Sequence, residues 1–283
     1  MDPHGNGFDA YAPREVPARV REFCIAKASL PLLSLAMLGL LAGAFIGLGA
    51  LMYTLVMSDA SLGFAMQRLL GGLAFSLGLV LVTVAGAELF TGNNLLVMAW
   101  ADGWIGTRQV LRNWTVVCAT NFVGAVALAV VVWLSGHAEM NGGAVGASAV
   151  RIAVAKANLG PVEAFFRGML CNVLVCIAAW MALAGRSVTD KVVAIVFPIT
   201  AFVAAGFEHS IANMYLMPLG MLLGAPIGVL DMLLNLAPVV AGNLVGGSVL
   251  VALVYHVIYV RPARRAPSQA APGAPTSTDA TLR

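Results

Sequence analysis

The sequence predicts an all-α membrane protein with six transmembrane helices, arranged as two inverted three-helix repeats in which the second and fifth helices are broken. Composition gives the first reason, because 60% of the residues are hydrophobic and only 10% are charged, against about 25% charged in soluble domains. Mean hydropathy is +0.90. The second reason is a set of long apolar segments, and the third is a polar motif that occurs twice inside them.

Apolar segments set the expected domain organisation, since one crossing takes about 20 predominantly apolar residues. We expect a cytoplasmic N-terminal segment at 1–29 with a short amphipathic helix over about 14–29, a channel domain at 30–260, and a disordered cytoplasmic tail at 261–283. Residues 135–161 are expected to be a Gly- and Ala-rich loop between repeats at about 30–135 and 162–260. The expected spans are 31–57, 69–100, 110–134, 163–183, 192–223 and 238–260.

Small residues in the first span predict close helix packing. Gly39, Gly43 and Gly47 recur at every fourth position, which places them on one helix face and lets a neighbouring backbone approach. Asn121 and Asn243, each followed two residues later by Val-Gly in a short repeated motif, are expected to hydrogen-bond neighbouring helices.

The polar motif lies at residues 85–93 and again at 205–213, an offset of 120 residues, with Ala, Gly, Glu and Asn matching. Each copy places a glutamate inside an apolar segment, where a charge costs roughly 2.5–3.5 kcal/mol. Both segments are too long for one straight crossing, so each is expected to be two half-helices joined by a non-helical turn. A second match, of residues 121–124 with 243–246 at an offset of 122, supports the repeat.

The repeat has a topological consequence. Each copy contains three crossings, an odd number, so the second copy is expected to be inverted relative to the first, with the two breaks meeting near mid-membrane. Inverted repeats with interrupted helices are typical of transporters whose pathway lies at the repeat interface. Six crossings with both termini cytoplasmic place twelve of the 16 Lys and Arg residues inside and four outside, as the positive-inside rule favours.

Polar residues in the breaks have structural and functional interpretations. Glu88 and Glu208 are expected to be structural and to accept backbone N–H bonds within the break, because an anion pathway avoids bare carboxylates. Asn93 and Asn213 are assigned to the same structural group. A lone buried histidine is often a satisfied core residue, but the twinned, broken context of His209 favours a role in a pore.

These motifs resemble the signature sequences of the formate/nitrite transporter family. Residues 88–92 and 206–214 are similar to the two broken-helix signatures, and residues 168–176 and 238–247 are similar to the fourth and sixth spans. The resemblance covers roughly residues 30–260. It implies an aquaporin-like protomer, a homopentamer with one pore per subunit in a bacterial inner membrane, and passage of formate, nitrite or hydrosulfide.

The resemblance also implies residue roles. His209 matches the central pore histidine of the family, Thr91 the threonine that hydrogen-bonds it, and Asn172 a pore-facing asparagine. Lys156 resembles a lysine near the outer vestibule that attracts anions, although simple snorkelling to the interface is an alternative for it. The apolar constrictions on either side of the histidine are matched by Phe75, Leu79, Leu89, Phe90, Val175 and Phe202.

Transport of formate, with proton coupling through His209, is therefore the expected function. The alternatives are nitrite or hydrosulfide transport, a pore for water, glycerol or ammonia, an intramembrane hydrolase, and a scaffold subunit of a redox complex. The sequence contains neither a His-Glu-x-x-His motif nor a Gly-x-Ser-x-Gly elbow, so an enzyme is not expected. The four cysteines lack metal-ligand spacing and no basic patch alternates with aromatics, so no metal, cofactor or nucleic acid is expected.

Overall fold

A computed structural model describes residues 10–261, and every regular element in that range is a helix. Within these residues six helices are long and apolar enough to cross a membrane, which confirms the predicted fold class. Their bounds are α2 (Leu32–Met57), α3 and α4 (Phe64–Phe75 and Leu77–Val84), α6 (Thr107–Leu134), α8 (Pro161–Ala184), α9 (Val188–Ala205), and α11 (Val229–Leu244) continued by the π-helical η3 (Val245–Leu253) and η4 (His256–Val260).

A shorter helix precedes the first membrane helix of each repeat. The amphipathic helix expected near the N-terminus is α1 (Val16–Ala28), and Pro17 stands in its first turn, where a missing N–H breaks no helical bond. The expectation of a loop over 135–161 is wrong. That segment contains the 3-10 turn η2 (His137–Glu139) and the 14-residue helix α7 (Ala144–Ala157), because residues 144–157 are rich in alanine, the strongest helix former.

Glycines let the helices of each repeat pack closely, as the spacing in the first span predicts. A Cβ atom on Gly43 of α2 would lie 2.1 Å from the carbonyl oxygen of Asn121 in α6. In the second repeat, a Cβ atom on Gly246 would lie 2.1 Å from the carbonyl oxygen of Met169 in α8. In both repeats the first and third membrane helices therefore touch through their backbones, where larger side chains would force the helices apart.

The second and fifth spans are interrupted, as expected. After α4 the chain is non-helical until the 3-10 turn η1 (Gly92–Leu95) and the six-residue α5 (Leu96–Ala101); after α9 it is non-helical until α10 (Ser210–Leu222). Gly86 and Gly206 begin the two breaks with φ of +81° and +77°, a conformation that glycine adopts without steric cost. The pieces are unequal, because the helix before each break is already long enough to cross a membrane.

The last span begins at Val229, earlier than the expected 238, and Pro238 lies inside it. Asp231 starts this helix by accepting a hydrogen bond from the Gly228 backbone N–H at 2.7 Å. The segment predicted to be a disordered tail falls outside the described residues from 262 onward.

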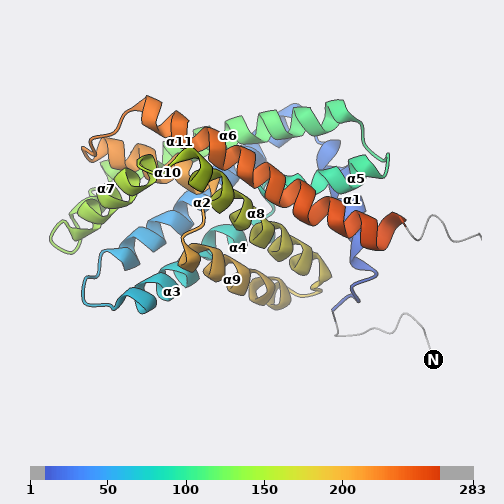
Figure 1. The fold of residues 1–283 in the computed structure, drawn as a ribbon, viewed down its shortest axis with the longest axis horizontal. Coiled ribbons are helices and arrows are strands. Elements are labelled where there is room, and N and C mark those ends of the chain that lie inside the picture. The colour runs from blue at the N-terminus through green and yellow to red at the C-terminus, as the bar shows by residue number, and fades with distance from the viewer. Residues whose placement is uncertain (1–9, 262–283) are drawn as a thin grey trace, which may run out of the picture.

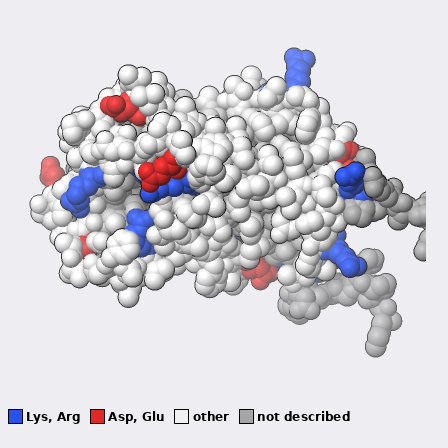
Figure 2. All heavy atoms as spheres, in the orientation of Figure 1, with Lys and Arg blue, Asp and Glu red and all other residues white. Residues whose placement is uncertain are grey.

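The arrangement in space fits two repeats of opposite direction. In Figure 1, α1 and α7 lie at opposite ends of the molecule, and the first and last described helices reach the same end. Figure 2 shows that the face in view is mostly uncharged. Large apolar side chains such as Leu33, Phe64 and Phe197 are 75%, 81% and 72% exposed, as expected for surfaces that face lipid or another subunit.

Candidate functional site

The two helix breaks meet at one contact between His209 and Thr91. The Nε2 atom of His209 lies 3.0 Å from the Thr91 hydroxyl oxygen, although the residues are 118 positions apart. His209 is 3% exposed and caps the N-terminus of α10, where its Nδ1 atom accepts a hydrogen bond from the Ala212 backbone N–H at 3.2 Å. Since Nδ1 is an acceptor, a neutral ring carries its hydrogen on Nε2 and donates it to Thr91.

A cavity lies on each side of this contact, and a pair of apolar side chains, here called a collar, lines each cavity. The first cavity, of about 280 Å³, is lined by His209 and by Phe75 and Phe202, whose ring centroids lie 5.7 Å apart. The second, of about 410 Å³, is lined by Leu79 and Leu89. Four of the six predicted constriction residues therefore line the two cavities.

Three other predicted pathway residues line neither cavity. Phe90 and Val175 are buried in the apolar core. Asn172 is fully buried, and its Nδ2 atom donates to the Thr91 carbonyl at 3.2 Å and to the Asn243 carbonyl at 2.7 Å. Asn172 thus ties the first break to the last membrane helix.

A network of four polar side chains surrounds the first break. The Nζ atom of Lys27, on α1, lies 2.8 Å from the Glu88 carboxylate and 2.9 Å from the Asn93 Oδ1 atom. The Asn93 Nδ2 atom donates to Glu88 at 2.7 Å and to Asn113 Oδ1 at 2.8 Å. Asn113 Nδ2 in turn donates to the Lys27 carbonyl at 3.4 Å.

A matching network surrounds the second break, except that the Asn213 Oδ1 atom has no hydrogen-bond partner among the described residues. The Nζ atom of Lys156, on α7, lies 2.9 Å from both carboxylate oxygens of Glu208. The Asn213 Nδ2 atom donates to Glu208 at 2.6 Å and to Asn235 Oδ1 at 2.8 Å, and Asn235 Nδ2 donates to the Lys156 carbonyl at 2.9 Å. Both glutamates thus accept from lysine and asparagine side chains, whereas the sequence led us to expect backbone N–H donors.

Asn121 and Asn243 hold the backbone of the breaks in place. Asn121 donates to the carbonyls of Gly39 at 2.7 Å and Glu88 at 2.9 Å, and accepts from the Phe90 N–H at 2.9 Å. Asn243 makes the matching bonds, to the carbonyls of Gly168 and Glu208 and from the Ser210 N–H, at 2.7, 3.0 and 3.0 Å. Backbone groups that no helix satisfies therefore find side-chain partners, as burial at membrane depth requires.

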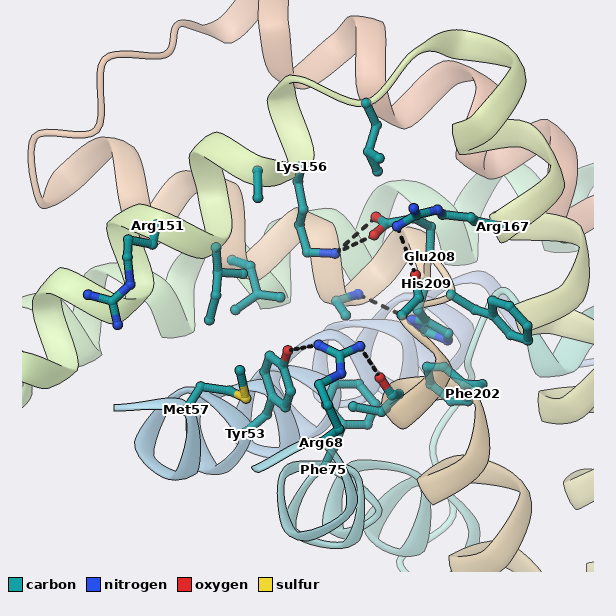
Figure 3. Close-up of a pocket in the computed structure, with 18 residues that line it drawn as sticks. Tyr53, Met57, Arg68, Phe75, Arg151, Lys156, Arg167, Phe202, Glu208 and His209 are labelled. Atoms are coloured by element: carbon teal, nitrogen blue, oxygen red, sulfur yellow. Dashed lines mark hydrogen bonds and ion pairs between the residues drawn. The ribbon is translucent and has the colours of Figure 1, made fainter. Parts of the chain in front are cut away.

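Three arginines join Lys156 in the lining of the cavity beside His209 (Figure 3). Arg68 donates to the Val203 carbonyl at 2.6 Å, to the Ala204 carbonyl at 3.0 Å and to the Tyr53 hydroxyl at 2.9 Å. Arg167 forms an ion pair with Glu163 and reaches the Gly206 carbonyl at 3.4 Å. Arg151 extends from α7 and is exposed.

Sequence reasoning missed Lys27, Asn113 and Asn235. A signal was present, because Ala26-Lys27-Ala28 recurs as Ala155-Lys156-Ala157 at an offset of 129 residues, and Asn113 recurs as Asn235 at the offset of 122 already found for Asn121. Within residues 10–261, no three His, Cys, Asp or Glu side chains lie close enough together to hold a metal ion.

A buried polar contact between apolar collars, with a cavity at either end and six membrane-length helices around it, defines a membrane channel or transporter. A sequence model described as formate/nitrite transporter matches residues 14–257. The chain belongs to the formate/nitrite transporter family.

Individual relatives agree with this assignment. The chain is 38% identical to the formate channel FocA of Escherichia coli K12, over 90% of this chain and 97% of FocA. It is 36% identical to a probable formate transporter of Methanothermobacter thermautotrophicus, over 87% and 97% of the two chains. A solved pentameric formate channel with formate bound superposes with a TM-score of 0.75 at 37% identity, covering 81% of this chain and 97% of that one. These relatives are channels and transporters, not enzymes.

Proposed function

We propose that this protein carries small monovalent anions, with formate as its main substrate, across the inner membrane of a bacterium. Formate is favoured because relatives at 38% and 36% identity are named as a formate channel and a probable formate transporter. We propose a homopentamer with one pore per protomer, on the example of the pentameric channel that covers 81% of this chain. The excess of basic residues in the expected inside segments supports cytoplasmic termini.

The observation that carries the proposal is the junction of His209 and Thr91 between two apolar collars and two cavities. A hydrated anion loses its water at such collars, and dehydration of a charge in an apolar passage is prohibitive without compensation. Passage as the neutral acid avoids most of this cost. The anion would take a proton at one cavity and release it at the other, while the junction supplies a hydrogen-bond donor where water is excluded.

The hydrogen-bond pattern indicates which group acts as that donor. The Ala212 N–H occupies His209 Nδ1, so the ring offers its Nε2 hydrogen to the Thr91 oxygen, and the Thr91 hydroxyl hydrogen is then free to face a passing substrate. A proton added at Nδ1 would face the Ala212 N–H and break the cap of α10. We therefore propose that His209 orients the donor, and that water in the cavities supplies the transported proton.

Lys156 and Glu208 would give the cavity beside His209 its shape. Their ion pair compensates the lysine charge, so we propose that attraction of anions to this cavity is shared with the surrounding arginines. Asn172 would keep Thr91 in place through its bond to the Thr91 carbonyl.

Transport by the purified protein in vesicles tests the proposal. We expect formate uptake that rises with an inward proton gradient, and we expect His209→Phe to abolish the proton-coupled part, because the Thr91 hydroxyl donor is no longer oriented toward the substrate. His137→Gln is the matched control, since this histidine lies in η2, away from both breaks. Unchanged uptake by His209→Phe would contradict the proposed role.

Competition in the same vesicles ranks the substrates. Nitrite and hydrosulfide are added against labelled formate at several pH values, and the strongest competitor identifies the preferred anion. Swelling in glycerol with no anion flux would instead identify a neutral-solute pore and overturn the proposal. Flux from the purified protein alone would exclude a role limited to scaffolding a redox complex.

A further inference from the structure

The two cavities share a repeated framework but differ in the charges around them. Lys156 and Glu208 in the cavity beside His209 correspond to Lys27 and Glu88 in the cavity beside Leu89. The arginines do not follow the repeat. At the offsets of 120 and 129 residues that relate the framework, the counterparts of Arg68, Arg151 and Arg167 are Val188, Glu22 and Leu38.

Three of the four cations in the cavity beside His209 are already engaged. Lys156 is held by both oxygens of Glu208, and Arg167 is paired with Glu163. Arg68 donates two hydrogen bonds to backbone carbonyls at the end of α9 and one to the Tyr53 hydroxyl. These side chains hold the walls of the cavity together, and their charges are partly compensated by the groups they contact.

Arg151 differs from the other three. It is exposed, and no hydrogen bond or ion pair joins it to any residue in the part of the chain that the structure describes. The nearby loop carboxylate of Asp59 is bound instead by the backbone N–H and the hydroxyl of Ser61, at 2.9 and 2.7 Å. In Figure 3, Arg151 and Lys156 extend from the same helix, with the Arg151 guanidinium directed away from the Lys156–Glu208 pair.

Arg151 also stands between two cavities. It lines the cavity beside His209 and an adjoining one of about 300 Å³, which is formed by the end of α2, the loop that follows and α7. The adjoining cavity presents the polar residues Ser58, Gln67 and Ser148. An anion that enters there meets an uncompensated guanidinium before it reaches the collar of Phe75 and Phe202.

We propose that Arg151 is an anion-recruiting site at the mouth beside His209. The inference rests on the proposed anion transport. One exposed unit charge about 6 Å from an anion in water raises its local concentration about threefold. The repeat counterpart Glu22 carries the opposite charge, and the second cation of the opposite cavity is Lys191, so Arg151 serves only the mouth beside His209.

Sided transport tests this proposal. In right-side-out and inside-out membrane vesicles, Arg151→Gln is expected to raise the formate concentration for half-maximal uptake about threefold from one side only, with the maximal rate unchanged. Arg151→Lys should restore the wild-type value, and Arg151→Glu, which copies the charge of Glu22, should raise it further. The difference should vanish when ionic strength rises from about 0.01 M to about 1 M, because the Debye length falls from about 30 Å to about 3 Å.

A matched control and three outcomes decide the result. Arg108→Gln removes an exposed arginine at the start of α6, outside both cavity linings, and should change nothing. An equal effect of Arg151→Gln from both sides, or a loss of maximal rate without a change in half-saturation, would overturn the proposal. So would a change in oligomer size, because Arg151 would then be an interface residue.

A readout that needs no transport separates this inference from the proposed function. Ala155 is exposed, lines the same cavity and accepts a reporter cysteine; Cys24, Cys171 and Cys176 are buried, and the partly buried Cys118 is replaced by alanine in every variant. The ratio of labelling rates by an anionic and a cationic thiol reagent of equal size should fall several-fold when Arg151→Gln is added to Ala155→Cys. If that ratio falls but wild-type vesicles carry no formate, the recruiting site stands and the proposed substrate fails. If formate is carried and the ratio is unchanged, the recruiting site fails alone.

Discussion

The two helix breaks have the same framework and different centres. Lys27, Glu88 and Asn93 recur as Lys156, Glu208 and Asn213 with nearly equal distances. The positions that meet at the junction do not recur. At the offset of 120 residues, His209 corresponds to Leu89, and Thr91 corresponds to Ile211.

This difference separates two physical problems. Each break exposes backbone groups at membrane depth, where no water satisfies them, so each needs its own set of side-chain partners. The pathway crosses the centre once, so it needs one donor pair, and each break contributes one member of it. The residues that recur in both breaks therefore satisfy the backbone of the breaks. The residues that do not recur, His209 and Thr91, belong to the proposed pathway.

The largest expected effect comes from breaking one ion pair of the framework. Lys27→Met leaves the Glu88 carboxylate buried without its cation, which should cost about 3–5 kcal/mol of folding free energy. Lys156→Met should cost a similar amount through Glu208. Unfolding of the purified protein in mixed detergents, followed by circular dichroism, measures both.

Double variants serve as the control for that prediction. Lys27→Met with Glu88→Gln, and Lys156→Met with Glu208→Gln, should each be more stable than the lysine variant alone, because no unpaired charge stays buried. If one lysine were dispensable while its counterpart was essential, the two frameworks would not be equivalent.

A smaller effect is expected on transport from the junction residues that do not repeat. Thr91→Val keeps the side-chain shape but removes the hydroxyl that contacts His209, so anion flux should fall about tenfold, the upper end of what one hydrogen bond between uncharged groups contributes. Ile211→Val, at the repeat-related position, should leave flux unchanged, and Thr91→Ser should retain most of it. Initial formate uptake in vesicles distinguishes them, and equal loss in Thr91→Val and Ile211→Val would show that packing rather than the hydroxyl matters.

The sequence was sufficient for the fold class and the two breaks, and the contact between Thr91 and His209 was expected from the family resemblance. Three features of the sequence predicted the fold class and the breaks: the length of the apolar segments, the spacing of the glycines and the motif repeated at an offset of 120 residues. The close packing at Gly43 and the hydrogen bonds of Asn121 follow from those signals directly.

Other features were missed although the sequence carried a signal for them in the repeated Ala-Lys-Ala triplet. Lys27 lies in a segment that looks like a polar leader, and only folding brings it 2.8 Å from Glu88. Helix α7 was predicted to be a loop because its segment is rich in glycine and alanine, and only the structure identified it. Its Ala-Lys-Ala triplet matches the one in α1. Lys156 and the glutamates were interpreted separately, so their mutual compensation was not foreseen.

The smallest expected difference lies at the glycines that open the two breaks. Alanine at either position is forced into a left-handed conformation, which costs about 1–2 kcal/mol. A methyl group added at Gly86 would enter open space, whereas one added at Gly206 would lie 3.0 Å from the Arg68 Nη2 atom. Gly206→Ala should therefore also loosen the Arg68 bond to the Val203 carbonyl and lower stability more than Gly86→Ala. Unfolding midpoints in mixed detergents measure the difference, and combining each substitution with Arg68→Lys should narrow it. Equal midpoints for the two alanine variants would mean that Arg68 moves aside without a cost in stability. The two breaks would then tolerate the substitution equally despite their different surroundings.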